Sequence, residues 1–109
     1  MPTELGVHSP RIERIRELQT PRGRREQGRY AIEGPTLIAE ALRSGVTIRE
    51  LYAVAQTLGA HPEAAALESA ATPVFTLPPR LYARCSDLET PPGLLAVVDI
   101  PAGFEAIIP

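Results

Sequence analysis

The apolar positions of the chain change between helical and strand-like spacing, which predicts a succession of short helices and strands. Near the N-terminus, Ile12, Ile15 and Leu18 recur every three residues behind a Ser-Pro pair, so we expect an amphipathic helix at about residues 10–20. The proline, glycine and arginine residues of 21–28 show no helical spacing and predict a loop. The chain therefore begins with one helix and an adjoining basic loop.

Helical and strand-like stretches then follow one another along the chain. Strands are predicted at 29–33, 48–54, 74–76 and 94–98, and helices at 35–42, 61–71 and 78–82. In the helix at 35–42, which Gly45 ends, the residues expected to face inward are Leu37, Ile38, Ala41 and Leu42. With its flanking strands this helix has the length of a βαβ unit, and the last strand is apolar enough to be covered on both faces. The pattern predicts an α/β fold, a three-layer α/β/α sandwich around about four strands in a mostly parallel or mixed sheet.

The composition suits a single-core domain in a reducing cytoplasm. With 109 residues, of which 44% are hydrophobic, the chain suits a single domain that folds without disulfides or metal. Cys85 is the only cysteine, which excludes an intramolecular disulfide and suits a reducing cytoplasm. The N-terminus has no secretory signal, and the longest apolar run, 94–98, is far shorter than the roughly twenty residues that cross a bilayer. We expect a cytoplasmic domain with no membrane partner.

Positive charge is concentrated near the N-terminus. Every basic residue is arginine, and seven of the eleven lie between Arg11 and Arg29 with three glutamates, whereas residues 30–109 hold four arginines and nine acidic residues. A basic face on an acidic domain can position a phosphate backbone as well as attract it. A solvated helix face and loop explains the same pattern.

The predicted loop carries the arginines that are most available to phosphate. It contributes Arg22, Arg24 and Arg25, with Arg29 directly after it, while Arg11 and Arg14 on the preceding helix extend the same surface. A second candidate contact is the turn at 33–36, where a strand ends at a glycine and a helix begins. Free backbone N–H groups at such a helix start can hold a phosphate, although the Gly-Pro pair can also serve the turn alone.

Other chemistry finds little support in the residues. No glycine-rich nucleotide loop occurs, His8 and His61 are too far apart for a standard metal-ligand spacing, and no metal site is expected. Cys85 is adjacent in sequence to a serine and an aspartate, which point in different directions and make no catalytic triad, so we interpret it as a small buried hydrophobic residue. Tyr82 is the aromatic residue best placed to stack on an unpaired base, although packing in the core is the favoured interpretation of it.

Two sequence blocks resemble a known family. The helix behind Ser9-Pro10 is followed at 24–45 by RR-x-x-GRY-x-IEGP-x-LI-x-EAL-x-SG, and 86–98 reads SD-x-x-TP-x-GLLAVV. These blocks resemble the N-terminal substrate-binding domain of SpoU (TrmH-type) RNA 2′-O-ribose methyltransferases, which belong to the SPOUT superfamily. The similarity extends over about residues 8–100, with Pro92 in place of the usual Gln. The Asn common after the first Ser and the Lys common in the first helix are absent, and Arg11 and Arg14 lie nearby instead.

The resemblance implies an accessory domain that grips RNA for a second domain. It implies the fold of the small ribosomal proteins that bind kinked RNA, with residues 1–100 as the RNA-binding domain and 101–109 as the start of a linker to a missing SPOUT domain. That second domain binds S-adenosylmethionine and carries the catalytic motifs, so no catalytic residue or cofactor is expected in this chain. On this interpretation the RNA is ribosomal or transfer RNA, and the contacts include Gly34, Thr36, Thr90 and Gly93. A rival hypothesis is a protein-interaction module that docks on its own catalytic domain or on an acidic partner.

Overall fold

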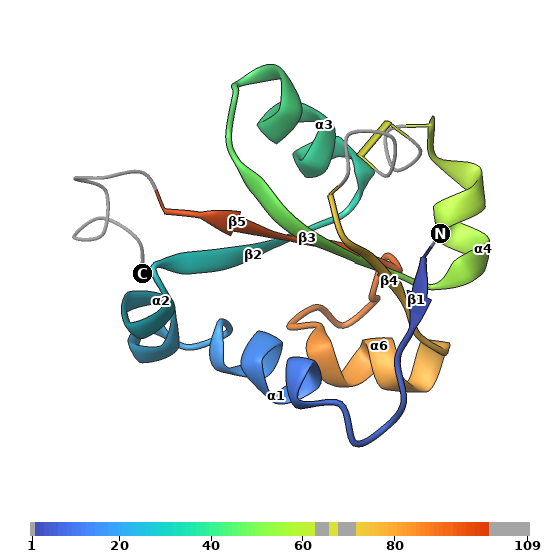
Figure 1. The fold of residues 1–109 in the computed structure, drawn as a ribbon, viewed down its shortest axis with the longest axis horizontal. Coiled ribbons are helices and arrows are strands. Elements are labelled where there is room, and N and C mark those ends of the chain that lie inside the picture. Colours follow the sequence, from blue (N-terminus) through green and yellow to red (C-terminus); the bar gives the residue numbers. More distant parts are fainter. Residues whose placement is uncertain (1, 63–65, 68–71, 101–109) are drawn as a thin grey trace.

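The computed structural model describes residues 2–62, 66–67 and 72–100 (Figure 1). The strands are β1 (Thr3–Glu4), β2 (Arg29–Glu33), β3 (Ile48–Ala53), β4 (Val74–Thr76) and β5 (Leu94–Asp99). The helices are α1 (Pro10–Glu17), α2 (Pro21–Gln27), α3 (Pro35–Arg43), α4 (Ala55–Ala60) and α6 (Pro79–Cys85). The strands predicted at 29–33, 48–54, 74–76 and 94–98 are confirmed, as are the helices at the start of the chain, at 35–42 and after Pro78.

The five strands form one mixed sheet in the order β1-β4-β3-β5-β2. β4 pairs in parallel with both β1 and β3, whereas β5 is antiparallel to both β3 and β2. The expectation of a mostly parallel or mixed sheet is therefore met by a mixed one, with β1 as a strand beyond the four predicted. β2 and β3 run in the same direction but have β5 between them, so the predicted βαβ crossover spans a strand. The interior position of β5 suits its apolar residues, which are buried along both faces of the sheet.

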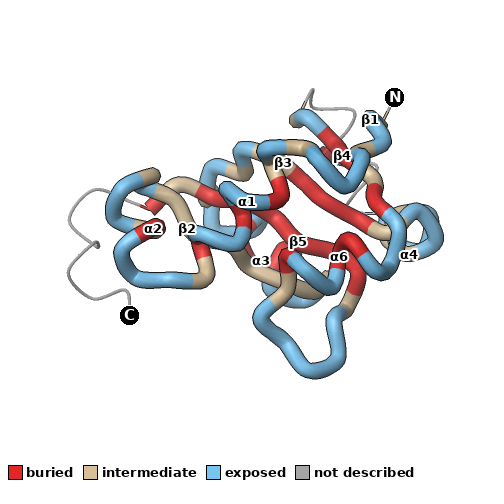
Figure 2. Tube along the Cα trace, turned by 90° about the horizontal axis from the view of Figure 1, so that it is seen from below, coloured by how far each residue is buried: buried red, intermediate tan, exposed pale blue. Residues whose placement is uncertain are grey.

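Helices cover both faces of the sheet and enclose two separate cores, as in the predicted three-layer sandwich (Figure 1). On one face, Ile12 and Ile15 of α1 and Tyr82 of α6 pack against residues of β3, β4 and β5. On the other face, Ile38 of α3 packs against the opposite sides of β3, β4 and β5. Figure 2 shows the buried residues following β3 and β5 through the middle of the molecule, while the loop between α6 and β5 projects from it. Burial of both faces explains why the interior strands are so apolar.

Residues 21–28 are a helix and not the predicted loop. Thr20 caps it by accepting a hydrogen bond from the Gly23 N–H at 3.1 Å, Pro21 occupies its first turn, and Gly28 ends it in the left-handed conformation. These are the ordinary signals of a helix start and stop. α2 contacts α1 through Gly23, Arg24 and Gln27 and has no apolar stripe, so hydrophobic spacing could not reveal it.

Several smaller expectations need correction. Ile38 and Ala41 face the core as predicted, but Leu37 and Leu42 are 54% and 39% exposed, because so short a helix buries only one narrow stripe. β1 and α4 were not predicted, since neither carries a clear apolar period. Of the helix predicted at 61–71, residues 63–65 and 68–71 lie outside the described part of the chain, and so does the expected linker at 101–109. No helix among the described residues is long and apolar enough to span a membrane.

Candidate nucleic-acid interface

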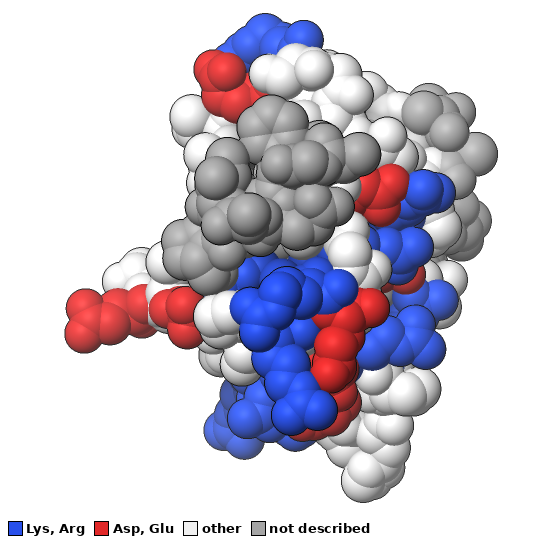
Figure 3. Space-filling view, turned by 90° about the vertical axis from the view of Figure 1, so that its left-hand side faces the viewer, with Lys and Arg blue, Asp and Glu red and all other residues white. Residues whose placement is uncertain are grey.

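We call the six arginines between residues 11 and 29 that were singled out from the sequence the basic surface: Arg11, Arg14, Arg22, Arg24, Arg25 and Arg29. They lie on α1, on α2 and at the start of β2, so the fold brings them to one side of the molecule. Figure 3 shows basic side chains gathered on this side, with acidic side chains between them. The structure thus places together residues that the sequence had only placed in one stretch, and it gives them different surroundings.

Arg11 is held within the domain. Its guanidinium pairs with Glu50, donates to the Tyr52 hydroxyl at 3.2 Å, and lies 4.2 Å from the centre of the Phe75 ring. Tyr52 in turn donates to Glu50 at 2.9 Å and stacks on Phe75 with ring centres 5.1 Å apart. The hydrogen bond to Tyr52 raises the pKa of Arg11, and burial raises the pKa of Tyr52. The network ties α1 to β3 and β4.

Arg24 also points inward. Its Nη1 donates to the Leu18 carbonyl oxygen at 2.9 Å, and its Nε is buried without a hydrogen-bond partner among the described residues. Beside it, Gly23 is buried so close to α1 that an added Cβ would stand 1.9 Å from the Glu17 carbonyl oxygen. Arg24 therefore helps hold the corner between α1 and α2.

The remaining arginines of the basic surface face solvent to different degrees. Arg22 is 84% exposed and pairs with Glu26 at 2.8 Å, while Arg29 is 35% exposed and lies 3.6 Å from Asp99, which also pairs with Arg49. Arg14 and Arg25 are exposed and have no carboxylate within ion-pair distance among the described residues. These two side chains are the most accessible to an anion, because no carboxylate of the described residues must be displaced from them.

The turn after β2 has the geometry expected of an anion-binding helix start. Gly34 has φ +98°, its N–H donates to the Leu94 carbonyl oxygen at 2.8 Å, and no side chain caps α3. Pro35 has no N–H, and the Ile38 N–H is bonded to the Gly34 carbonyl at 3.2 Å. The first turn therefore presents its free donors at Thr36, which is exposed, and at the residue after it.

The loop 86–93 lies beside this turn. Its end is fixed by Gly93, which has φ +78°, is buried against Thr57, and accepts a hydrogen bond from the Val54 N–H at 2.9 Å. Thr90, by contrast, is exposed. Gly93 therefore shapes the loop from inside, and Thr90 is the predicted contact that solvent reaches. We call Gly34, Thr36, Thr90 and Gly93 the turn site.

The carboxylate of Glu33 connects the turn site to the helical layer, which the sequence did not reveal. One oxygen accepts a hydrogen bond from the Tyr82 hydroxyl at 2.8 Å, and the other accepts from the Asp87 backbone N–H at 3.3 Å. These partners are 49 and 54 residues away in sequence, so no local signal could have found them. The same is true of Glu50, which holds Arg11.

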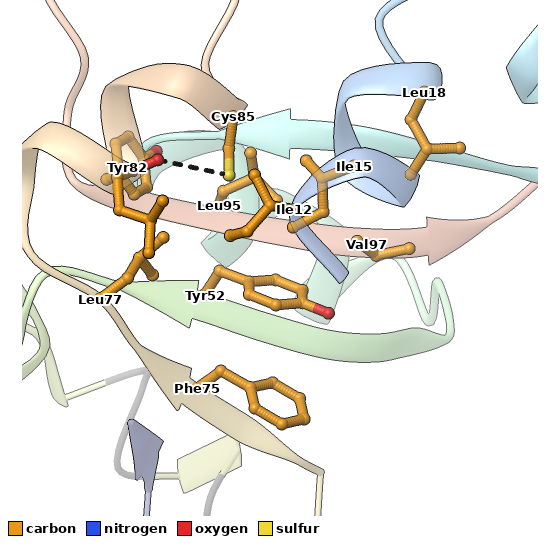
Figure 4. Packing of buried hydrophobic residues seen from close by; sticks show 11 residues of the cluster. Ile12, Ile15, Leu18, Tyr52, Phe75, Leu77, Tyr82, Cys85, Leu95 and Val97 are labelled. Carbon is orange, nitrogen blue, oxygen red and sulfur yellow. Dashed lines mark hydrogen bonds between the residues drawn. The ribbon is translucent and has the colours of Figure 1, made fainter. Parts of the chain in front are cut away.

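Tyr82 and Cys85 belong to the core. Tyr82 is 1% exposed, so the suggestion that it stacks on a base is wrong, because α6 turns this side chain onto the sheet (Figure 4). Cys85 is fully buried, which confirms its interpretation as a small hydrophobic residue; burial raises the pKa of its thiol to about 11. The described residues hold no cluster of three or more potential metal ligands.

The two groups of candidate residues lie at opposite ends of the edge strand β2. Arg29 begins the strand beside α2, and Glu33 ends it at the turn site. Five residues of extended backbone place these ends about 13 Å apart. One molecule that followed this edge of the sheet would meet both groups.

A family model described as the MRM3-like substrate binding domain matches residues 9–96, which is most of the chain. The chain belongs to this family. The match covers the basic surface, the turn site and the strand between them, so all of the candidate residues lie within the substrate-binding domain. No curated protein matches the chain.

Solved structures share the fold of this substrate-binding domain. A crystal structure of an RNA 2′-O ribose methyltransferase has a TM-score of 0.74 and 24% identity over 94% of the chain, which covers 39% of that protein. An rRNA methyltransferase from Sinorhizobium meliloti has a TM-score of 0.74 and 19% identity over 89% of the chain, which covers 36% of that protein. A TrmH-family protein from Porphyromonas gingivalis has a TM-score of 0.69 and 29% identity over 90% of the chain, which covers 37% of that protein. The chain therefore spans less than two-fifths of each of these proteins. The likeness to the TrmH-family protein supports the suspected SpoU/TrmH relationship, and the other two likenesses show the fold.

Proposed function

We propose that this domain binds RNA, and that it does so as the substrate-binding part of a longer RNA 2′-O-ribose methyltransferase. The observation that carries the proposal is the placement of two anion-binding features, the basic surface and the uncapped start of α3, at the two ends of β2 in a domain of a substrate-binding family. The similar solved structures include an RNA 2′-O ribose methyltransferase and an rRNA methyltransferase, which favours RNA, ribosomal RNA in particular, as the substrate.

In the proposed complex the arginines hold the phosphate backbone. Arg14 and Arg25 bind phosphate directly, and Arg22 exchanges its exposed partner Glu26 for phosphate at little cost, because exposed ion pairs are weak. Arg29 turns from the half-buried Asp99, which keeps its pair with Arg49. Arg11 and Arg24 reach the RNA only with the parts of their guanidinium groups that the domain leaves free. Their main role is to hold α1 and α2 in place.

At the other end of β2 the RNA meets backbone donors. The free N–H groups at Thr36 and the following residue bind a phosphate, as the start of a helix favours negative charge. Thr90 contributes its hydroxyl from the loop, and Gly93 gives that loop its shape. Because phosphates of one strand are spaced by several ångströms, a short stretch of RNA along β2 reaches both sites.

Methyl transfer belongs to a part of the protein outside this chain. One similar solved structure, the SpoU methyltransferase AviRb from Streptomyces viridochromogenes, is a complex with AdoMet, and the chain covers 37% of it. We propose that S-adenosylmethionine and the catalytic residues are supplied by a C-terminal SPOUT domain, and that the whole protein acts in the cytoplasm.

A salt titration of RNA binding tests the proposal. We expect a labelled, folded fragment of large-subunit ribosomal RNA to bind the chain with an affinity that falls steeply as salt rises, because bound arginines release counterions from phosphate. The variant Arg14→Ala/Arg25→Ala should bind more weakly and flatten the slope of log K against log salt by about 1.5. These two residues are chosen because neither guanidinium group is hydrogen-bonded or ion-paired within the described part of the domain.

The matched control is Arg43→Ala/Arg80→Ala, which removes the same charge from α3 and from the start of α6. We expect it to keep the wild-type slope. Equal effects of the two double variants would show that net charge, and not the basic surface, governs binding. Absence of binding even at low salt would contradict the proposal and favour the rival role, docking on another protein domain.

A further inference from the structure

The last residue of β2 carries a carboxylate whose two oxygens are both occupied. Glu33 accepts one hydrogen bond from the buried Tyr82 hydroxyl on α6 at 2.8 Å and another from the Asp87 N–H at 3.3 Å. Its side chain points to the α6 face of the sheet, as the alternation along β2 requires, because Tyr30 and Ile32 pack against the opposite core. A charged side chain at the end of an edge strand is normally left in water, whereas Glu33 is hydrogen-bonded within the domain.

The partners of Glu33 lie where α6 ends and the loop 86–93 begins. Ser86 caps the end of α6, its N–H bonded to the Tyr82 carbonyl at 3.2 Å, and its hydroxyl oxygen accepts from the Leu88 N–H at 3.1 Å. The Asp87 N–H between them is the donor that Glu33 takes. Glu33 therefore fixes the first residues of the loop to the strand that leads directly into Gly34 and α3.

The other end of the loop is fixed to the same turn. The Leu94 carbonyl, directly after Gly93, accepts from the Gly34 N–H at 2.8 Å. Glu33 and Gly34 are adjacent, so consecutive residues hold both ends of the loop beside the start of α3. With both ends fixed, the exposed Thr90 keeps a defined position relative to the free N–H groups of the helix.

We propose that Glu33 is a positioning residue for RNA binding, which holds the loop 86–93 against the start of α3 so that the turn site is formed before RNA arrives. The inference rests on the proposed function. Glu33 makes no contact with RNA itself, because both oxygens are engaged and a carboxylate repels phosphate. Preorganised sites bind more tightly because less ordering remains to be done on binding.

The charge of Glu33 makes the inference testable, because two explanations predict opposite signs. If Glu33 merely adds negative charge near the RNA, Glu33→Gln should bind the ribosomal RNA fragment more tightly. If it positions the loop, Glu33→Gln should bind about 5-fold more weakly, since an amide accepts with only one of its two ends and one hydrogen bond is lost. Glu40→Gln on α3, which removes the same charge from an exposed pair, is the matched control and should not weaken binding.

Hydrogen exchange of the Asp87 amide in the free chain reports the positioning directly. We expect exchange about tenfold faster in Glu33→Gln than in the wild type, with core amides of β5 unchanged. Tyr82→Phe keeps the Glu33 carboxylate but removes the hydroxyl that donates to it. It should weaken RNA binding and speed Asp87 exchange, each by less than Glu33→Gln does. This second variant also serves if Glu33→Gln folds poorly.

The outcomes separate the two proposals. Weaker RNA binding together with faster Asp87 exchange supports the role of Glu33. Unchanged Asp87 exchange, or faster exchange with RNA binding as tight as in the wild type, overturns it while leaving the proposed function intact. A wild-type chain that binds no RNA at any salt concentration overturns the proposed function and the role of Glu33 in it.

Discussion

At the scale of single residues, the arginines of the basic surface divide by where their guanidinium groups are bonded. Arg24 donates to the Leu18 carbonyl in the corner between two helices, whereas its neighbour Arg25 is exposed. Both had been grouped from the sequence as phosphate contacts, because the charge of a residue says nothing about which way its side chain points. The distinction decides which substitution affects stability and which affects binding.

Replacing Arg24 should therefore destabilise the fold. We expect Arg24→Ala to lower the free energy of unfolding by about 1–2 kcal/mol, since the Leu18 carbonyl loses its donor and the buried stem of the side chain is removed. Arg25→Ala, which removes the same charge from an exposed position, should change stability by less than about 0.5 kcal/mol. Urea unfolding followed by circular dichroism measures both, and equal losses would contradict the inward role of Arg24.

At the scale of elements, α2 exists because its ends are well capped and one position lacks a side chain. Thr20 and Gly28 supply the start and stop, and Gly23 lets the helix approach the last turn of α1. α2 is only 7 residues long and has no apolar stripe, so isolated helix propensity does not account for it. Its packing on α1 carries Arg22 and Arg25 to the same side as Arg14.

A glycine comparison tests this packing. In an ordinary helix, replacing glycine by alanine stabilises by about 1 kcal/mol, but Gly23→Ala places a Cβ 1.9 Å from the Glu17 carbonyl oxygen and should destabilise by at least about 2 kcal/mol. Gly28→Ala meets no neighbour within 4 Å and should cost about 1 kcal/mol, from its left-handed backbone at φ +66° alone. Thermal unfolding checks the order, and a stabilising Gly23→Ala would show that α2 does not pack against α1 in this way.

At the scale of the whole molecule, the sheet keeps its two cores apart and holds both candidate sites along one edge. Cys85 lies in the core between α1, α6 and the sheet, where it is fully buried and its thiol donates to the Leu81 carbonyl at 3.6 Å (Figure 4). Reaching it requires α6 to leave the sheet. The lone thiol is thus a natural reporter on opening of this layer.

The thiol of Cys85 should react slowly in the folded protein. Because burial raises its pKa to about 11, the reactive thiolate is scarce at pH 8, and we expect labelling by a disulfide reagent to be slower than in urea-unfolded chain by at least about 100-fold. The unfolded thiol should react faster as pH rises toward its ordinary pKa near 9. Rapid labelling of the folded chain would place Cys85 at the surface and contradict the packing of α6.

The elements that carry an apolar signal, and the family of the domain, could be predicted from the sequence alone. Ile12 and Ile15 of α1 and Ile38 and Ala41 of α3 are buried at helical spacing, and β5 is a nearly continuous apolar run. The two sequence blocks sufficed to suggest the SpoU/TrmH relationship that the family match supports. Such features are local, since each can be judged from residues within one turn or one strand. The concentration of arginine before residue 30 was equally visible.

The directions and partners of those residues follow from the tertiary structure alone. It turned Arg24 inward, made a helix of residues without apolar spacing, placed β5 between β2 and β3, and joined Glu33 to Tyr82 and Asp87. Each of these depends on contacts between segments brought together by packing. A single sequence records which side chains are available for such contacts, but the direction and partner of each side chain are set by the layers that fold around it.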